Sequence, residues 1–330
     1  MKTVYYHLSP YISHLSAGQA YRRAMLQAGI PLADRPEDAD VVILHDAPVN
    51  FPAILKAFPA IRKKELIAYS VWETDILPDA YVEPLSMVDA IWTCSEFSRA
   101  AFQTRFENVS VVPHIVEETS LLPDDVSKVK KMISYDPNAY YFYTIMDSLN
   151  PRKNLAALLD IFIQNFLHDP DVFLVVKQYR TPVDLSGLKK IIPVNASLTD
   201  SQISALHHLC HCYVSAHHCE AWGLPLSDAL GTGNAAIATG YSGNMAFMNR
   251  DNSYPADFTL TRVSEDMCRR IPLFTTAMRW ADPDPGHFGH LMRKVRGMGP
   301  PRPGERRLIA ESMRPFRPVA VADILRERLR

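Results

Sequence analysis

The sequence lacks the features that mark membrane, secreted or nucleic-acid-binding proteins. Its apolar runs fall short of the roughly 18 residues that a membrane span requires. No signal-peptide pattern precedes the strand-like run at residues 3–8. Lys and Arg number 35 against 36 Asp and Glu, so the balance of charge indicates no whole-molecule attraction to nucleic acid or to a membrane. We therefore expect a cytoplasmic protein that binds no nucleic acid.

Cysteine is also scarce. The five cysteines are an odd number and lie mostly among apolar residues, which argues against a disulfide framework. Histidines and cysteines do crowd between residues 207 and 219, a composition that suggests zinc. However, the helix expected from Thr199 leads into a strand expected at 212–215, where alternate side chains point to opposite faces and do not converge on one ion. We predict no metal site.

Short runs of β-forming residues alternate with helical segments, which predicts an α/β fold with parallel sheets covered on both faces. At 330 residues the chain is long enough for two domains of ordinary size. A boundary is expected between about 113 and 136, after which the alternation restarts. No Gly-x-Gly-x-x-Gly follows the first expected strand, which argues against an NAD-type oxidoreductase. The expected strands are residues 3–8, 40–44, 65–69, 89–93, 110–112, 140–146, 171–176, 212–215 and 235–238.

The most informative stretch runs from residue 212 to 239 and reads as strand, acidic loop, helix and strand. Glu220 lies just before a turn that contains Gly223, and Asp228 follows within the expected helix. In α/β sheets, ligands bind beyond the carboxyl ends of the strands, where helix N-termini present free N–H groups. Two carboxylates beside such an N-terminus suit a ligand that carries both hydroxyls and phosphates, such as a nucleotide sugar.

The segment Glu220-Ala-Trp-Gly-Leu-Pro-Leu-Ser-Asp228, with Tyr241-Ser-Gly-Asn244 after it, closely resembles the donor-binding signature of retaining glycosyltransferases of family 4. The family motif is Glu, seven residues, Glu, so the second acid here is one methylene shorter. The resemblance covers about residues 70–300 and is densest in the second half. It implies the GT-B fold, in which two Rossmann-like domains face each other across a cleft. The parts expected from it are an acceptor domain at 1–120, a donor domain at 121–314, and a C-terminal helix at about 315–330 that crosses back to the first domain.

Arg152 and Lys153 lie between an expected strand and a helix expected from residue 154. Cations near a helix N-terminus are electrostatically disfavoured, so a bound anion explains the pair better than an ordinary first turn does. The resemblance puts the phosphate-binding lysine of the family at Lys153. Many members also have an arginine five residues earlier, where this chain has Ser148. Either Arg152 substitutes for that arginine, or the phosphate clamp is weaker.

The resemblance also implies roles for residues in the acidic loop and beyond. Glu220 is expected to contact hydroxyls of the transferred sugar, and Asp228 those of the ribose. Gly223 lets the backbone approach the ligand closely. For Ser242-Gly243-Asn244 two interpretations stay open: N–H groups at the start of a helix near the phosphates, or a simple turn. The donor-binding residues expected here are Trp222, Gly223, Leu224, Asp228, Ser242, Gly243 and Asn244.

In the first half, Trp72-Glu73-Thr74 follows an expected strand and also resembles family 4. Glu73 is expected to face the cleft, where it orients the acceptor hydroxyl or stabilises positive charge on the sugar ring. Gly18, read as preceding a helix at 18–28, stands where family members let the first domain approach the donor phosphates. His114 ends a strand, either as a donor contact or as a hydrogen-bonded structural group. The residues expected to be catalytic are Glu220, Lys153, Arg152 and Glu73.

The function that the resemblance implies is transfer of a sugar, with its anomeric configuration kept, from a UDP- or GDP-linked donor to a hydroxyl of a saccharide or lipid-linked acceptor. No metal or other cofactor is expected, because the family has no divalent-metal requirement. The branch suggests bacterial surface polysaccharide or glycoconjugate synthesis. Two alternatives remain open: a non-catalytic GT-B partner subunit, and a nucleotide-sugar epimerase of the same fold.

The C-terminal 40 residues are basic, with eleven Arg and Lys against four Asp and Glu between residues 291 and 330. Such a surface is either a solvated face or a patch for anionic lipid headgroups. The second interpretation adds peripheral contact with the inner face of the cell membrane to the expected localisation. Nothing in the pattern indicates an oligomeric state.

Overall fold

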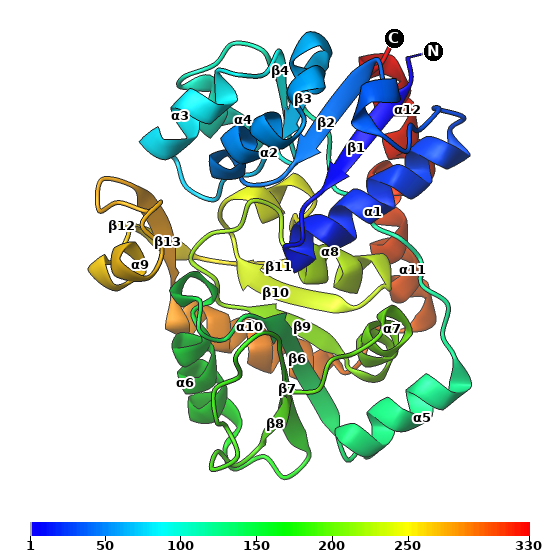
Figure 1. Cartoon of the computed structure of the whole chain (residues 1–330). Coiled ribbons are helices and arrows are strands. Elements are labelled where there is room, and N and C mark those ends of the chain that lie inside the picture. The colour runs from blue at the N-terminus through cyan, green and yellow to red at the C-terminus, as the bar shows by residue number, and fades with distance from the viewer. Residues whose placement is uncertain (1) are drawn as a thin grey trace.

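The first domain is built on a parallel sheet of five strands in the order β1-β2-β3-β4-β5. The computed structural model describes residues 2–330 and places this domain above the second (Figure 1). Both ends of each of its five short apolar strands agree with the predicted ranges to within one residue. They are β1 (Val4–Leu8), β2 (Val41–His45), β3 (Glu65–Tyr69), β4 (Ala90–Thr93) and β5 (Val109–Val111).

Helices cover both faces of this sheet. Leu32 forms a parallel bridge with Val4, so the chain passes the outer edge of β1 before it crosses to β2 on the other side. This reversal puts α1 on one face and α2, α3 and α4 on the other, where two separate apolar clusters form. A reversal of this kind opens a crevice at the carboxyl ends of the neighbouring strands. The helices are α1 (Ile12–Gln27), α2 (Phe51–Ala57), α3 (Asp79–Leu85) and α4 (Glu96–Gln103), with short 3-10 turns η1 (Pro36–Asp38), η2 (Pro48–Asn50) and η3 (Pro59–Lys63).

The helix α1 begins at Ile12 and not near Gly18, which corrects the predicted range. Gly18 lies inside the helix and faces the sheet. A Cβ at this position would lie 2.5 Å from Leu8 Cδ2 and 3.2 Å from His45 Nδ1. The glycine therefore marks close packing of α1 on β1 and β2, a tertiary constraint that resembles a helix start in the sequence.

The second domain has a six-stranded parallel sheet in the order β11-β10-β9-β6-β7-β8. The chain moves outward from β6 to β8, then returns to the other side of β6 and continues outward to β11. The reversal therefore lies between β6 and β9. The strands are β6 (Tyr140–Met146), β7 (Val172–Gln178), β8 (Ile191–Val194), β9 (Cys212–Ser215), β10 (Ala235–Thr239) and β11 (Tyr254–Ala256).

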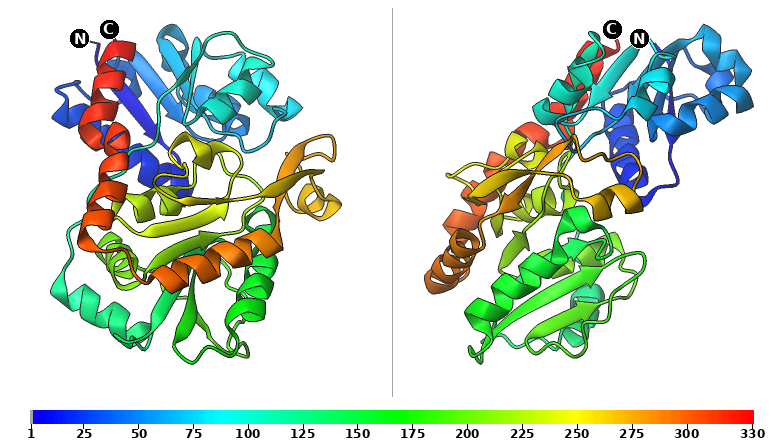
Figure 2. Two further views of the ribbon diagram at one scale, coloured as in Figure 1. Left: turned by 180° about the vertical axis from the view of Figure 1, so that it is seen from behind. Right: turned by 90° about the vertical axis from the view of Figure 1, so that its left-hand side faces the viewer.

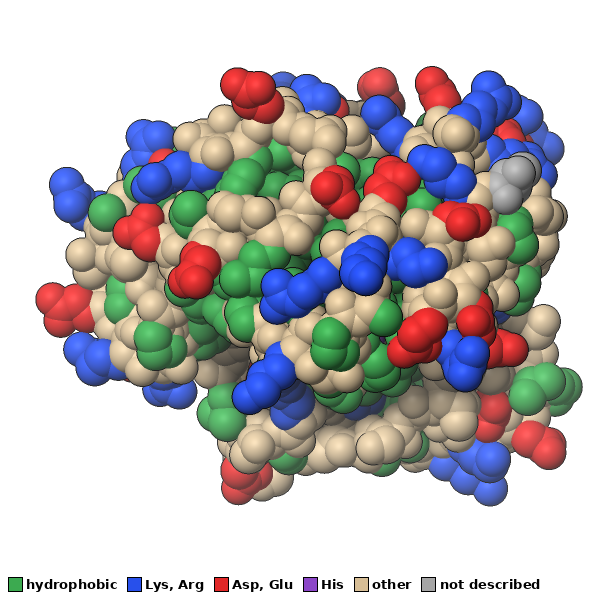
Figure 3. Space-filling view, turned by 45° about the horizontal axis from the view of Figure 1, so that its top comes forward, with side chains coloured by type: hydrophobic (Ala, Val, Ile, Leu, Met, Phe, Trp, Pro, Cys, Tyr) green, Lys and Arg blue, Asp and Glu red, His purple; other side chains and the backbone are tan. Residues whose placement is uncertain are grey.

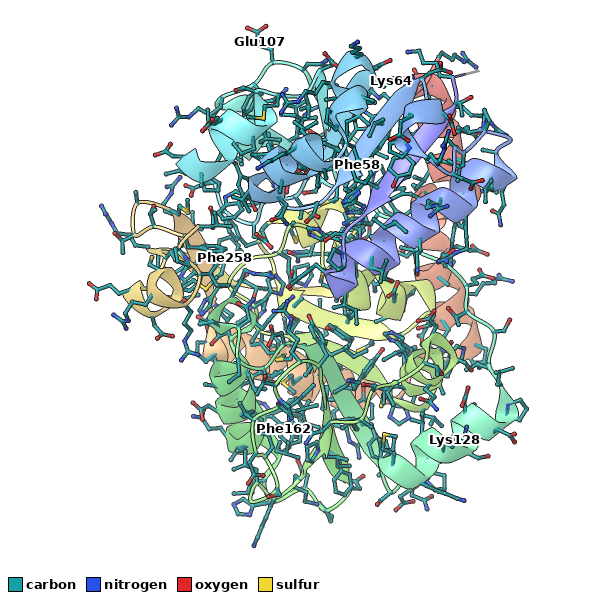
Figure 4. The ribbon with its side chains drawn as sticks, in the orientation of Figure 1. Phe58, Lys64, Glu107, Lys128, Phe162 and Phe258 are labelled. Carbon is teal, nitrogen blue, oxygen red and sulfur yellow. The ribbon has the colours of Figure 1, made fainter. Side chains whose placement is uncertain are left out.

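Helices α6 and α10 pack on one face of this sheet, and α7 and α8 on the other. In Figure 4 Phe162 lies in this lower domain, on α6, where its ring is buried. The helices and 3-10 turns are α5 (Pro123–Met132), η4 (Pro151–Lys153), α6 (Leu155–Phe166), α7 (Asp200–Leu209), α8 (Leu224–Gly231), η5 (Gly243–Ala246), α10 (Pro285–Met298), α11 (Pro303–Ser312) and η6 (Arg314–Phe316).

The C-terminal helix α12 (Pro318–Arg328) returns to the first domain. It packs on α1, and the Arg326 guanidinium donates to the Ala28 carbonyl at 2.8 and 3.0 Å. The two ends of the chain consequently lie close together at the top of the molecule (Figures 1 and 2). None of the helices within residues 2–330 combines the length and the apolar character that crossing a membrane would take.

An antiparallel hairpin with a short helix projects from the second domain, and the sequence pattern did not predict it. It consists of β12 (Phe258–Arg262), α9 (Glu265–Arg270) and β13 (Arg279–Pro283). We call residues 257–284 the arm. The arm lies beside both domains (Figure 2), and several of its apolar side chains join the core cluster of the first domain.

Candidate active site

The loops that follow β6 and β9 meet at the carboxyl edge of the second sheet, where the strand order reverses. Crevices at such reversals are the usual ligand sites of open α/β sheets. Arg152 and Lys153 form η4 shortly after β6, whereas Glu220 lies in the loop after β9. Residues 67 positions apart in sequence, Lys153 and Glu220, are thereby brought into direct contact.

Glu220 accepts hydrogen bonds from both cations. Lys153 Nζ donates to Glu220 Oε1 at 2.5 Å, and Arg152 Nη1 donates to Oε2 at 2.7 Å. Arg152 Nη1 also donates to the Cys219 carbonyl at 2.7 Å, while its Nη2 lies 3.5 Å from Glu73 Oε1. The side chains of Glu220, Arg152 and Lys153 are only 10%, 11% and 13% exposed. The four residues predicted to be catalytic therefore form one buried charge cluster across the two domains.

The packing of this cluster sets its ionisation states. Burial opposes ionisation of Glu220, but Lys153 and Arg152 together outweigh it and hold the pKa of the carboxyl well below its usual range. Burial also opposes the charge of Arg152, and Glu220 and Glu73 raise its pKa above the usual value. Burial dominates for Glu73 and raises its pKa, against the opposing effect of Arg152. Glu220 is therefore ionised at physiological pH, and Glu73 is the carboxyl of the cluster that is protonated more readily.

Ser242 and Gly243 hold the backbone of Glu220. The Glu220 N–H donates to Ser242 Oγ at 2.8 Å, and the Gly243 N–H donates to the Glu220 carbonyl at 2.8 Å. A Cβ on Gly243 would lie 1.7 Å from the Ala221 carbonyl oxygen, so a larger residue cannot fit without movement of this loop. A 3-10 helix, η5, does begin here, as one interpretation expected. The Gly243 N–H is occupied by the Glu220 carbonyl, and contact between this segment and the donor phosphates stays a prediction.

Asn244 is fully buried and supports the same loop. Its amide donates to the Thr239 carbonyl at 3.0 Å, and its Oδ1 lies 3.2 Å from His217 Nε2. Thr239 ends β10, and His217 follows the carboxyl end of β9 by two residues. The predicted donor-binding segment Ser242–Asn244 therefore positions the acidic loop.

Gly223 is the N-cap of α8 and has a left-handed φ of +97°, a conformation that favours glycine. It lines a narrow pocket together with Lys153 and Glu220. The Lys153 ammonium gives this pocket anion-binding character, since at the start of α8 Pro225 has no N–H and the N–H groups of Leu226 and Ser227 donate to the Gly223 carbonyl. Trp222, one position earlier, is buried and packs edge-on against His114 with ring centroids 5.8 Å apart.

Asp228 and Leu224 line a neighbouring cavity of about 290 Å³ between the two domains. Ser16 of α1 lines the same cavity from the first domain. The Asp228 side chain is partly exposed in this cavity. Loss of water around its carboxyl raises its pKa to about 7, and the negative charge of Glu117 adds to this effect. The second acid of the motif therefore does not meet Glu220 directly. It lies further along α8, on the wall of the interdomain cleft.

His114 and Gly18 lie in the first domain behind this cleft. His114 is buried, with its Nδ1 3.2 Å from the Tyr21 hydroxyl and 3.3 Å from the Tyr69 hydroxyl. Burial lowers the pKa of His114 to about 3, so the imidazole is neutral at physiological pH. The structure gives both residues packing or hydrogen-bonding roles, and their contact with a donor stays a prediction.

A cavity of about 540 Å³ lies on the other side of Arg152. Glu73 and Arg152 line it together with Asp46, Arg180 and Phe274 of the arm. The sequence analysis did not assign any of the last three to the site. Asp46 follows the second expected strand, at 40–44, by two residues and was therefore detectable, but Arg180 and Phe274 reach the cavity through contacts between distant segments.

Arg180 is another guanidinium that could take the place of the family arginine whose position is occupied by Ser148 in this chain. It follows β7, has a left-handed φ of +64°, and its Nη1 lies 3.1 Å from Asp147 Oδ2. Its guanidinium also lies 4.5 Å from the ring centre of Tyr11. These contacts place it at the larger cavity and not at the Lys153 pocket. Arg152 is accordingly the guanidinium that stands beside Lys153.

The crowd of histidines and cysteines is structural in this fold. The side chains of Cys210, Cys212 and Cys219 are buried, and His207 Nδ1 lies 2.7 Å from the Tyr143 hydroxyl. Within residues 2–330 no three His, Cys, Asp or Glu side chains are grouped so that they could hold a metal ion.

Comparison with known proteins gives structural matches only, since no protein-family model and no curated protein matches the sequence. The HepE protein of Anabaena, solved with UDP-glucose, has a TM-score of 0.65 at 14% identity and covers 100% of this chain and 99% of its own. A glycosyltransferase of Rickettsia africae has a TM-score of 0.65 at 12% identity, covering 99% and 88%. WaaG, a glycosyltransferase of lipopolysaccharide biosynthesis, has 0.61 at 11%, covering 98% and 99%.

This chain has the GT-B fold. The match extends over the whole of both domains, so the fold predicted from the resemblance is confirmed. At 11–14% identity the likeness concerns the fold, and the chemistry has to be argued from the site itself.

Proposed function

We propose that the protein is a retaining, metal-independent glycosyltransferase that transfers a sugar from a nucleotide diphosphate sugar to a hydroxyl acceptor. The observation that carries the proposal is the convergence of Lys153 and Arg152 on Glu220 at the strand reversal. A carboxylate suits sugar hydroxyls, and the ammonium and guanidinium suit the diphosphate. The structural relatives bound to UDP-glucose, or to UDP and glucose, support a donor of this class.

The proposed chemistry uses the charge cluster to stabilise the leaving group. As the bond between the anomeric carbon and the diphosphate breaks, negative charge grows on the phosphate oxygen and positive charge on the sugar ring. Lys153 and Arg152 stabilise the first, and Glu220 and Glu73 the second. The acceptor oxygen then bonds to the anomeric carbon from the face that the diphosphate leaves, and its proton passes to a phosphate oxygen. Configuration is thereby kept, and no covalent enzyme intermediate is required.

The remaining parts of the cleft fit the same assignment. Asp228, in the cavity of about 290 Å³, is proposed to bind the ribose hydroxyls of a UDP- or GDP-linked donor. The cavity of about 540 Å³ beside Glu73 is proposed to hold a saccharide or lipid-linked acceptor. Closure of the two domains would exclude water from the reacting atoms.

The biological setting that we propose is surface polysaccharide or glycoconjugate synthesis, with peripheral contact at the inner face of the membrane. Besides the basic segment 291–330, the run Arg62-Lys63-Lys64 is a second candidate surface, and Figure 4 places Lys64 at the top of the first domain. Figure 3 shows several Lys and Arg side chains close together near the middle of that face, with acidic side chains around them. Binding to anionic against neutral vesicles tests this contact.

The activity test is release of nucleotide diphosphate from a panel of UDP- and GDP-sugars, with and without saccharide acceptors. Lys153→Ala should lower the rate of transfer by at least about 100-fold, because it removes a cation that stabilises the leaving group. Lys131→Ala, which removes an exposed lysine of α5, is the matched control and should behave like the wild type. Unchanged transfer in Lys153→Ala would refute the assignment.

The non-catalytic alternative is favoured by two departures from the family pattern, Asp228 and Ser148. It predicts that the wild-type protein neither binds nor consumes any nucleotide sugar in calorimetry or in the release assay. An epimerase would instead convert the donor sugar without an acceptor, which analysis of the products would detect.

A further inference from the structure

The arm connects the two loops that carry the site carboxylates. In β13, Trp280 stacks on His218 with ring centroids 4.1 Å apart, and the Ala281 N–H donates to the His218 carbonyl at 2.9 Å. His218 lies two positions before Glu220. Strand β13 of the arm is therefore fixed to the acidic loop of the second domain.

The first residue of β13 and the segment before this strand contact the first domain on both sides of Glu73. Phe274 packs against Trp72 with ring centroids 4.8 Å apart. The backbone N–H and the Nε of Arg279 donate to the two carboxylate oxygens of Asp75, each at 2.8 Å. The arm thus spans from the Glu220 loop to the Glu73 loop.

Between these contacts the arm forms one wall of the cavity of about 540 Å³. Ile271, Leu273 and Phe274 make this wall apolar. The volume lies within the range of about 300–1,000 Å³ that is usual for small-molecule sites. A segment of the second domain therefore shapes a cavity whose other walls belong mainly to the first domain.

The wall contributed by the first domain is polar, and its carboxylate, Asp46, has unused hydrogen-bonding capacity. Asp46 Oδ1 accepts from the Ala47 N–H, Asn50 Nδ2 and Ser9 Oγ at 2.7 to 3.0 Å. Within residues 2–330, Asp46 Oδ2 makes no hydrogen bond, since His7 Nε2 lies 3.7 Å away, which is too far. Buried polar groups of this kind normally find a partner, so the cavity is suited to a ligand with hydroxyls.

We propose that the arm is the acceptor-selecting wall of the site: Leu273 and Phe274 hold the apolar C–H face of a pyranose acceptor, and Asp46 binds its hydroxyls from the opposite wall. This assignment rests on the proposed glycosyl transfer and deepens it. An apolar wall facing a carboxylate matches a pyranose ring, which has one face of C–H groups and an edge of hydroxyls. Acceptor specificity is then decided by the second domain as well as the first.

The test compares Phe274→Leu with Phe258→Ala. Phe274→Leu keeps an apolar side chain that can pack on Trp72 but removes the flat ring. Phe258 is on β12 of the same arm (Figure 4), where it packs against Tyr241 and does not line the cavity. Thermal denaturation establishes that each variant is folded. The probes are the methyl pyranosides of glucose, galactose, mannose and N-acetylglucosamine.

Two measurements separate this inference from the proposed function. In the first, Phe274→Leu should raise the acceptor KM by about 3- to 10-fold, the effect of losing one aromatic contact. Asp46→Asn should raise the same KM, whereas Phe258→Ala should not. Equal acceptor KM values in Phe274→Leu and the wild type would overturn the inference while leaving glycosyl transfer intact.

The second measurement needs no catalysis. Saturation-transfer NMR with the same pyranosides should show the strongest signals from ring C–H protons in the wild-type protein, and these signals should weaken in Phe274→Leu. If the wild type consumes no donor, the proposed function fails, and the NMR comparison still decides the inference. Signals of equal strength in the two proteins, or none in either, would overturn it.

Discussion

The substitution Glu220→Gln tests the charge cluster most directly, because it removes one negative charge while the shape of the side chain is kept. After this substitution the two cations that contact Glu220 keep different partners. Arg152 still has Glu73 at 3.5 Å and the Cys219 carbonyl at 2.7 Å. Lys153 loses the one carboxylate with which it forms an ion pair within residues 2–330. The variant therefore leaves one buried ammonium without a counter-charge.

The expected loss of stability follows from this geometry. Removing one partner of a buried ion pair typically costs about 3–5 kcal/mol. We expect the lower end, about 3 kcal/mol, because Arg152 keeps other partners. For a domain of this size that corresponds to a fall in Tm of roughly 6–12 °C. Differential scanning calorimetry measures it, with Glu107→Gln as the control, since Glu107 is an exposed loop residue (Figure 4) and its substitution should change Tm by less than about 2 °C.

The pH dependence gives the same test a second readout. A carboxyl whose folded pKa is depressed stabilises the fold above its unfolded pKa of about 4.3, and this contribution is lost as the pH falls through the folded value. The difference in Tm between the wild type and Glu220→Gln should therefore be full near pH 7 and shrink below about pH 4. A Tm shift no larger than that of Glu107→Gln at pH 7 would refute the coupling inferred here.

Two further predictions concern the support of the acidic loop and the second acid. Gly243→Ala should prevent folding or lower Tm far more than Gly297→Ala does. A Cβ on Gly243 would lie 1.7 Å from the Ala221 carbonyl oxygen, whereas a Cβ on Gly297 would meet nothing within 4 Å. Equal Tm values of the two variants in thermal denaturation would contradict this prediction. Asp228→Asn should become more stable relative to the wild type as the pH rises from 5 to 8, because a carboxyl whose folded pKa is raised to about 7 destabilises the fold when it ionises. The measurement is the difference in Tm between the two proteins across that pH range. A difference that does not change with pH would contradict this prediction.

Much of the fold could be predicted from local sequence pattern. The strand ranges 65–69, 140–146 and 212–215 agree with β3, β6 and β9 at both ends. These runs are short and apolar, and both faces of the strands are covered, so a continuous hydrophobic signal was present. The helix boundaries were predicted less well, as the start of α1 shows, because a glycine that serves packing between elements resembles one that begins or ends a helix.

The arm could not be predicted in the same way. Its strands β12 and β13 carry partly exposed and mixed residues, so their pattern is weak. What fixes the arm is contact with His218, Trp72 and Asp75, which are far from it in sequence. The same reason hid Arg180 and Phe274 from the sequence analysis of the site.

By itself, the sequence determined the alternation of strands and helices, which follows from local hydrophobic periodicity. It also determined the chemical types of the donor-side residues, which lie in one continuous motif. Only the tertiary structure decided that Lys153 and Arg152 share Glu220, that the Gly243 N–H supports this carboxylate's loop, and that the arm walls the neighbouring cavity. The physical reason is that these properties depend on distances between segments and on burial. Both arise only when the sheet reverses between β6 and β9 and the two domains pack together.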